Sequence, residues 1–215
     1  MDNVTFSYNK GKSIVKDIDL RIAQSQFTAL VGPNGSGKTT LGKLISGILK
    51  PDSGNVYLDG NNISEMTLGQ VGKKIGYLFQ NPDCQIFTAK VYEELSFILK
   101  LKDMKEDKII NKVDEMLELF QISHLKECHT FNLSHGEKQR LAIAAILINK
   151  PRYLILDEPT TGLDIKRKKI LSDILKELLK EGIGMTIISH DQFLMKDCAA
   201  FVVKINGGEI IERYS

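Results

Sequence analysis

The string from Gly32 to Thr39 constrains this chain most, because it reads Gly-Pro-Asn-Gly-Ser-Gly-Lys-Thr and matches the pattern G-x-x-x-x-G-K-[ST]. The apolar run 27–31 before it predicts a strand. After it, apolar residues recur at helical intervals as far as Leu49, and Pro51 ends the pattern. A glycine-rich turn carrying a surface lysine is the alternative, but the flanking strand and helix favour a phosphate-binding loop.

Each part of this string suits a phosphate. Glycines let the backbone approach closely and present N–H groups, together with the positive end of the following helix. Lys38 supplies a charge for β- and γ-phosphates, and the Thr39 hydroxyl is placed to bind Mg²⁺. We therefore predict that ATP is held by residues of this loop and helix: Asn34, Gly35, Ser36, Gly37, Lys38, Thr39 and Thr40.

A carboxylate to hold the magnesium follows another apolar run. Asp157 ends the run 153–156, at the carboxyl end of a predicted parallel strand, where sheet ligands are expected. Glu158 comes next and is placed to polarise an attacking water as a general base. The alternative is that the two acids only cap the next helix.

Strand and helix patterns alternate along the chain and predict an α/β sheet fold. A helix starts near Ser134, and its apolar body 141–148 is expected to be buried. A further buried strand covers 185–188, and 201–211, interrupted by Asn-Gly-Gly, predicts a hairpin. The stretch from about Gln80 to Leu133 reads as helical.

Bulk composition narrows the class of protein. The formal net charge of +2 gives no reason to expect a nucleic-acid partner. The longest apolar run has about eight residues, against about 20 for a membrane-spanning helix, and the amino terminus lacks the pattern of a secretion signal. We therefore expect a cytoplasmic protein. Its three cysteines, including Cys198, are read as ordinary thiols.

The segment Leu133 to Arg140 reads Leu-Ser-His-Gly-Glu-Lys-Gln-Arg and resembles the signature of the ATP-binding cassette family, usually Leu-Ser-Gly-Gly-Gln followed by Gln-Arg. The resemblance implies that the signature residues bind the γ-phosphate of ATP held by a partner subunit. These residues are Ser134, His135, Gly136 and Glu137. Taken alone, Ser134 and Glu137 have only the spacing of a helix capping box.

Four further matches occur in the family's order. Tyr8 resembles the aromatic residue that stacks on adenine, and Gln80 the glutamine that senses magnesium and water. Asp164 lies in a Thr-Gly-Leu-Asp string that resembles the loop at the dimer interface, and His190 resembles the switch histidine. The resemblance implies one ATPase domain over 1–215, with a phosphate-loop core, an antiparallel β portion and a helical subdomain at about 81–133. Individually, a lone tyrosine or histidine is more often structural.

The string from Asn81 to Phe87, Asn-Pro-Asp-Cys-Gln-Ile-Phe, is similar to that of the energy-coupling-factor branch, which imports vitamins or transition-metal ions. This resemblance implies a transmembrane subunit, a second cassette in a homo- or heterodimer, and a place on the inner face of the membrane. Ile86 and Phe87 are candidate docking anchors, with core packing as the alternative. Other functions stay open: another ABC importer or exporter, a soluble ABC ATPase, or a phosphate-loop kinase or GTPase. A kinase or GTPase would leave the signature and His190 unexplained.

Two further features bear on function: an altered signature and a basic cluster. His135 and Glu137 replace the usual Gly and Gln, which predicts a weaker ATP site wherever this signature is used. The basic cluster 166–169 could face an anionic lipid or nucleic acid, but it opens an amphipathic helix and is interpreted as a solvated face.

Overall fold

The computed structural model describes residues 1–9, 11–191, 194 and 200–214, so Cys198 lies outside the described residues. Among them, the main sheet has the strand order β11-β10-β3-β9-β8-β7, parallel except for β11 at one edge. Its strands are β3 (Phe27–Val31), β7 (Ile75–Leu78), β8 (Tyr153–Asp157), β9 (Gly184–Ile188), β10 (Phe201–Asn206) and β11 (Glu209–Tyr214). This arrangement confirms the predicted α/β class and the predicted terminal hairpin.

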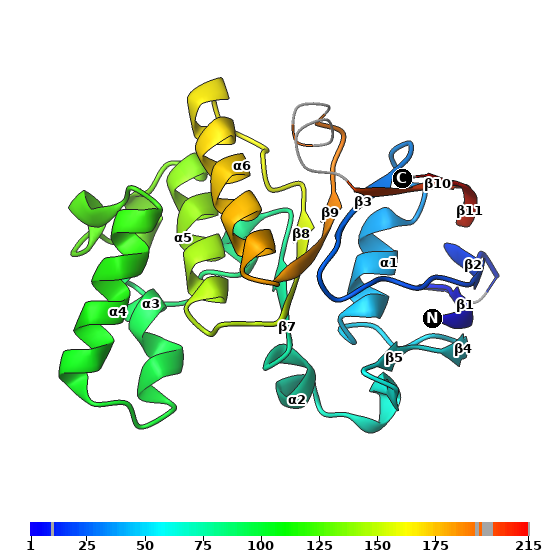
Figure 1. The fold of residues 1–215 in the computed structure, drawn as a ribbon, viewed down its shortest axis with the longest axis horizontal. Helices are drawn as coiled ribbons and strands as arrows, with labels where there is room; N and C mark the ends of the chain where they lie inside the picture. Colours follow the sequence, from blue (N-terminus) through cyan, green and yellow to red (C-terminus); the bar gives the residue numbers. More distant parts are fainter. Residues whose placement is uncertain (10, 192–193, 195–199, 215) are drawn as a thin grey trace.

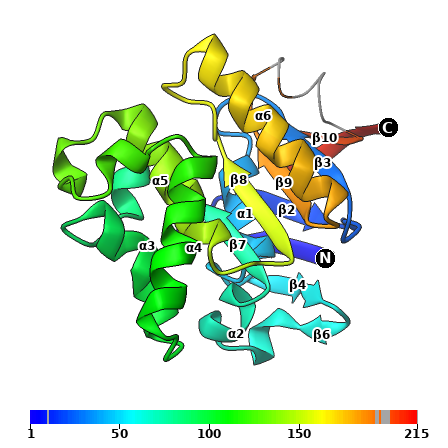
Figure 2. The same ribbon diagram turned by 60° about the vertical axis from the view of Figure 1, so that its left-hand side comes forward.

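Helices cover both faces of this sheet, as Figures 1 and 2 show. In β8 the side chains alternate: Leu154 and Leu156 join the core under α5 (His135–Leu147) and α6 (Ile165–Lys180). Ile155 points the other way, into the core that contains α1. Because successive strand residues face opposite sides of a sheet, a wholly apolar strand is what a sheet covered on both faces requires.

The helix after the phosphate loop, α1 (Lys38–Ile45), is shorter than predicted. The apolar spacing continued to Leu49, but Gly47 has a φ of 69° and ends the helix in the left-handed conformation. Ile48 is consequently 37% exposed. The prediction of this helix was correct in position and wrong at its end.

The middle of the chain forms two longer helices, α3 (Val91–Lys100) and α4 (Glu106–Leu119), which pack together at one end of the molecule (Figure 1). α4 buries Ile109, Val113 and Leu117, which form the apolar side of this helix, in the core. The rest of the stretch from Gln80 to Leu133 consists of loops and 3₁₀ turns: η2 (Pro82–Cys84), η3 (Ser123–Leu125) and η4 (Thr130–Asn132). The helical interpretation therefore holds for about half of it.

Shorter elements complete the other end. A three-stranded antiparallel sheet has the order β2-β1-β4, and a small hairpin pairs β5 with β6. These elements, with the connecting η1 turn and α2, are β1 (Asp2–Phe6), β2 (Val15–Ile18), β4 (Ser53–Asn55), β5 (Tyr57–Leu58), β6 (Asn61–Asn62), η1 (Ile63–Glu65) and α2 (Leu68–Gly72). Within the described residues, none of the helices combines the length and the apolar character needed to cross a bilayer.

Candidate nucleotide-binding site

The loop between β3 and α1 has the backbone shape that a phosphate cradle needs. Gly35 and Gly37 have φ values of 77° and 102°, which L-residues with a side chain rarely adopt. A Cβ on Gly37 would also lie 2.7 Å from the carbonyl oxygen of Ile14, and one on Gly32 would lie 2.0 Å from that of Ile205. Two neighbouring segments therefore pack directly on the loop backbone and hold its shape.

Lys38 starts α1 and lies within this loop. Its Nζ donates to the carbonyl oxygens of Gly32 and Pro33, at 2.9 Å each, and the residue is only 7% exposed. Burial lowers the pKa of Lys38, while the charges of Glu158 and Asp157 act in the opposite direction. The ammonium is thus held between the loop and two carboxylates, where it can pair with the oxygens of a phosphate.

Two buried oxygens at this place have no hydrogen-bond partner among the described residues: Ser36 Oγ and Asp157 Oδ1. Buried polar atoms are nearly always paired, so an orphaned oxygen suggests a missing ligand. The other carboxylate oxygen of Asp157, Oδ2, accepts from the Tyr77 hydroxyl at 3.4 Å. Asp157 therefore offers one oxygen to a cation, as a hard divalent cation such as Mg²⁺ requires.

The environment of Asp157 combines opposing influences. Burial raises the pKa of Asp157, the Thr39 hydroxyl lowers it, and the neighbouring Glu158 raises it again. Two carboxylates and a hydroxyl therefore converge beside the loop, with Lys38 as the nearby cation. This donor set fits Mg²⁺ bound by Thr39 and Asp157.

Glu158 follows β8 with a φ of 50° and is largely buried, since its side chain is 17% exposed. Its Oε2 accepts from Ser189 Oγ at 3.3 Å, and its Oε1 lies 3.7 Å from Nε2 of His190. Ser189 and His190 follow the adjacent strand β9, so the sheet order brings the predicted base and the predicted switch histidine together. A carboxylate oriented in this way can accept a proton from water.

The remaining predicted residues near the loop differ in their placement. The Tyr8 hydroxyl lies 3.3 Å from Thr40 Oγ1, and its ring packs edge-on against Phe6 with centroids 5.0 Å apart. Tyr8 is 55% exposed and leaves an aromatic face beside the loop. Gln80 is exposed and makes no hydrogen bond to the described residues, Asp157 included.

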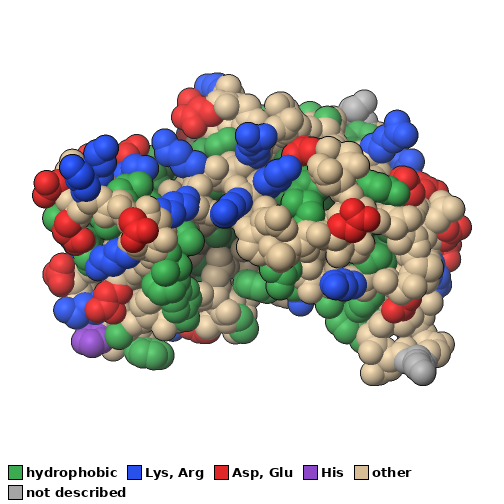
Figure 3. All heavy atoms as spheres, turned by 90° about the horizontal axis from the view of Figure 1, so that it is seen from below, with side chains coloured by type: hydrophobic (Ala, Val, Ile, Leu, Met, Phe, Trp, Pro, Cys, Tyr) green, Lys and Arg blue, Asp and Glu red, His purple; other side chains and the backbone are tan. Residues whose placement is uncertain are grey.

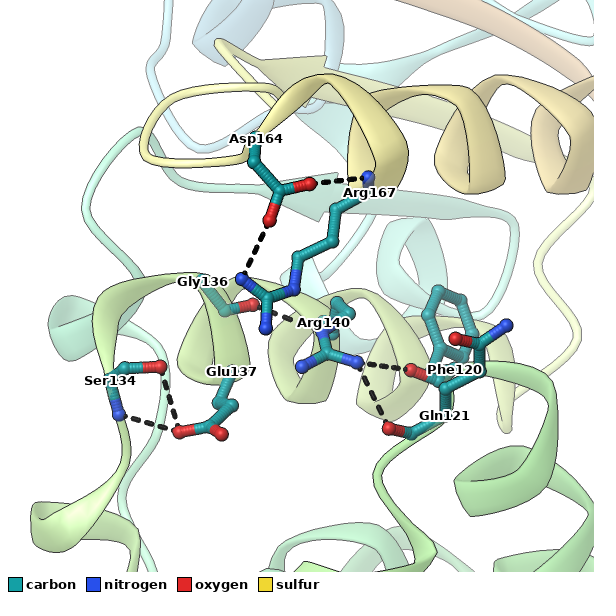
Figure 4. Close-up of polar contacts among 8 residues, drawn as sticks. All are labelled: Phe120, Gln121, Ser134, Gly136, Glu137, Arg140, Asp164 and Arg167. Carbon is teal, nitrogen blue, oxygen red and sulfur yellow. Dashed lines mark hydrogen bonds and ion pairs between the residues drawn. The ribbon is translucent and has the colours of Figure 1, made fainter.

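The signature segment forms a helix terminus, with Ser134 as the N-cap of α5. Figure 4 shows Glu137 Oε2 accepting from the backbone N–H of Ser134 at 2.8 Å and from its hydroxyl at 2.7 Å. These hydrogen bonds are the main reason why the pKa of Glu137 is lowered. The capping-box interpretation is therefore correct. Within the described residues, no hydrogen bond joins this segment to the phosphate loop.

The Thr-Gly-Leu-Asp string that ends at Asp164, predicted to form the dimer-interface loop, lies against the start of α5. A Cβ on Gly162 would stand 2.5 Å from Cδ2 of His135, so the histidine ring covers that glycine. Asp164 is the N-cap of α6, accepts from the backbone N–H of Arg167 at 2.8 Å, and pairs with its guanidinium at 2.9 Å. Both oxygens of the Asp164 carboxylate thus bind Arg167, one through the backbone N–H and one through the guanidinium, in the first turn of α6.

Tyr77 and Ser189 were missed by the sequence reasoning. Both are buried, and their hydroxyls donate to Asp157 and Glu158 respectively. Ser189 had a usable signal, because it directly precedes His190 at the carboxyl end of a predicted strand. Tyr77 had none, since a tyrosine in an apolar strand is usually a core residue.

Comparisons with known proteins point to one family. A family model described as ABC transporter matches residues 15–161. The energy-coupling factor transporter ATP-binding protein EcfA of Methanothermobacter thermautotrophicus is 39% identical over 211 residues, 97% of this chain and 68% of that protein. The structure of CbiO1 from Clostridium perfringens, described as part of the ABC transporter complex CbiONQ, has a TM-score of 0.87 and 37% identity, covering 99% of this chain and 86% of that chain. A dimeric ATP-binding cassette in a post-hydrolysis state bound to ADP and Pi has a TM-score of 0.92 and 27% identity, covering 100% and 97%.

Proposed function

The chain belongs to the ABC transporter family, and on this premise we propose that it is the ATP-hydrolysing subunit of an energy-coupling-factor type transporter that imports a vitamin or a transition-metal ion. One observation carries the proposal most: Lys38, Asp157 and Glu158 interact beside the phosphate loop, and one buried oxygen of Asp157 has no hydrogen-bond partner among the described residues. The similarity to EcfA and to CbiO1 supports the branch.

In this proposal the loop from Asn34 to Thr40 holds the phosphates of ATP, and Tyr8 supports its adenine. Thr39 and Asp157 hold Mg²⁺, with Gln80 as a further ligand once its loop closes. The metal, when bound, neutralises charge on the phosphate oxygens. Glu158, oriented by Ser189, accepts the proton of the attacking water, and His190 stands beside it.

We also propose a transmembrane subunit as the partner, which would keep the chain on the inner face of the membrane, and a docking place for it beside Phe87. This side chain is 65% exposed and packs edge-on against Phe97, with ring centroids 4.8 Å apart. The buried Glu94 accepts from the backbone N–H groups of Phe87 and Thr88, at 3.1 and 2.9 Å, and so fixes the loop.

A groove of about 320 Å³ lies next to Phe87 and is bounded by β7, α3 and the end of α5, with Phe97, Ile98 and Ile146 in its walls. Seen from below, the molecule shows hydrophobic side chains gathered between its helical end and its sheet end (Figure 3). Aromatic residues in such grooves are typical anchors of protein interfaces. We propose that a segment of the transmembrane subunit occupies this groove.

Replacing Phe87 with aspartate is expected to abolish co-purification with the transmembrane subunit while leaving ATP binding intact, because a charge cannot be buried cheaply in an apolar contact. Leu101→Asp is the matched control, since Leu101 is also 65% exposed and lies outside the groove. Pull-down and calorimetry with ATP measure the two outcomes. Retained co-purification would contradict the docking role, and unfolding of the isolated chain would favour core packing for Phe87.

The second partner in this proposal is another cassette, arranged so that each ATP lies between one phosphate loop and the signature of the other chain. Here the Ser134 hydroxyl already donates to Glu137, whose carboxylate brings a negative charge to the place assigned to a phosphate. This chain therefore contributes a complete phosphate loop to one site and a weakened signature to the other. A partner with the usual signature would restore one competent site.

Restoring the usual signature is expected to raise ATP turnover. Glu137→Gln removes one charge at an exposed helix terminus, for which about a two- to fivefold gain is expected. His135→Gly is tested separately and in combination, because the ring also covers Gly162 and its loss can loosen that contact. Turnover and dimer mass of the purified chain are measured in MgATP. Brisk hydrolysis by a homodimer, unchanged by the double substitution, would contradict the asymmetric arrangement.

A further inference from the structure

A pocket of about 240 Å³ lies away from the phosphate loop, between α5, the amino terminus of α6 and the turn that follows α4. Figure 4 shows its two arginines: Arg167 reaches down from α6 and Arg140 reaches across from α5. Lys166 and His124 also line it. This pocket includes the first part of the basic cluster 166–169, which the nucleotide site does not use.

Arg140 is held in a fixed position by carbonyl oxygens. One terminal nitrogen, Nη1, donates to the carbonyls of Phe120 and Gln121 at 2.9 and 3.0 Å, at the end of α4. Its Nε lies 3.4 Å from the carbonyl of Gly136. The second terminal nitrogen, Nη2, has no hydrogen-bond partner in the described part of the chain. A guanidinium fixed in this way loses little conformational freedom when it binds a ligand.

The positive charges of the pocket are not fully balanced. Arg140, Lys166 and Arg167 line the pocket together with two carboxylates, Glu137 and Asp164, so one positive charge is in excess. Glu137 accepts from Ser134, and Asp164 pairs with Arg167. The Lys166 ammonium makes no ion pair with the residues that the structure describes. Burial lowers the pKa of Arg140 and the nearby charge of Arg167 lowers it further, while the charges of Glu137 and Asp164 act in the opposite direction. An anion between them would relieve this repulsion.

The size of the pocket limits the ligand. Pockets for drug-sized molecules usually measure about 300–1,000 Å³, so a volume of about 240 Å³ suits a small group. Guanidinium forks bind phosphate oxygens in a bidentate manner, and a lysine adds a point charge. We propose that Arg140, Lys166 and Arg167 form a binding site for a single phosphate group, carried by free phosphate or by a small phosphate ester.

The test uses the full chain labelled with ¹⁵N, and follows the Nε–Hε signals of Arg140 and Arg167 while inorganic phosphate is added. Saturable shifts of both signals are expected. Because the phosphate loop also binds phosphate, the Gly35 amide is followed as a separate reporter of that site. A parallel titration with glycerol 3-phosphate distinguishes the two sources, since a tighter fit for the ester would identify an ester as the ligand.

Lys166→Gln with Arg167→Gln is expected to weaken phosphate binding at this pocket by about tenfold or more, without changing the Gly35 response. The matched control, Lys108→Gln with Lys169→Gln, removes the same charge from exposed positions outside the pocket and is expected to change nothing. Lys166→Gln alone keeps the Asp164–Arg167 pair and guards against a folding defect. Unsaturable shifts, equal weakening in the control, or acetate binding as tightly as phosphate would overturn the proposal.

Discussion

Replacing Glu158 with glutamine is expected to lower ATP turnover by about 10²- to 10⁴-fold, the usual contribution of a general base, while MgATP binding persists. Glutamine keeps the shape of the side chain and can still accept from Ser189 Oγ, which lies 3.3 Å from the carboxylate. What it loses is the ability to take a proton from water. In the proposed arrangement, in which ATP lies between two cassettes, dimers containing ATP should accumulate when hydrolysis is slow.

Turnover is measured within the assembled complex, and dimer mass is measured in MgATP. Glu181→Gln serves as the control, because this glutamate is exposed at the end of α6. A Glu158→Gln complex that hydrolyses ATP at the parent rate would show that another group is the base. The positive φ of Glu158, 50°, makes glutamine a better test than a β-branched residue, which would strain the backbone.

Replacing Lys38 with alanine is expected to weaken ATP affinity by about ten- to a hundredfold, because hydrogen bonds to a charged group contribute about 1.5–3 kcal/mol. The ammonium is the cation that lies between the phosphate loop and the carboxylates of Asp157 and Glu158. Its removal leaves the phosphates opposite two acids without the positive charge of the lysine. Calorimetry with ATP, with and without Mg²⁺, measures the change.

Alanine also leaves the carbonyls of Gly32 and Pro33 without their donor, so the loop itself can relax. Lys38→Met keeps the apolar stem and separates lost packing from lost charge. Lys50→Ala, at an exposed position just beyond α1, is the control. Unchanged affinity in both Lys38 variants, with unchanged melting temperature, would mean that nucleotide binds elsewhere.

Local patterns predicted much of the fold, since strand β8, helix α5 and the hairpin β10–β11 all lie where the residue pattern placed them. Two predictions were less accurate for reasons outside the pattern. The helix after the phosphate loop ends at Ile45, because Gly47 takes a left-handed conformation that apolar spacing does not report. Much of the segment before the signature forms 3₁₀ turns, whose short length produces no clear periodicity.

The candidate site also has a part that the sequence predicted and a part that depends on the folded chain. The phosphate loop was readable because its residues are consecutive and their backbone geometry is local. Contacts between distant segments were not readable: the Tyr77 hydroxyl on Asp157, and Ser189 on Glu158, depend on which strands are neighbours. The pocket between Arg140 and Arg167 likewise needs two helices that are separate in the chain.

By itself, the sequence determined the chemistry available to this protein: a glycine-rich loop with Lys38 and Thr39, an acidic pair after a buried strand, and a helix that begins at Ser134. Only the tertiary structure decided what those groups touch. The order of the parallel strands brings the residues after β8 and β9 together at one edge, and packing of α5 beside α6 places two arginines around one small pocket. The physical reason is range: backbone conformation and helix capping depend on residues a few positions apart, whereas pairing, burial and charge balance depend on neighbours that only the folded chain supplies.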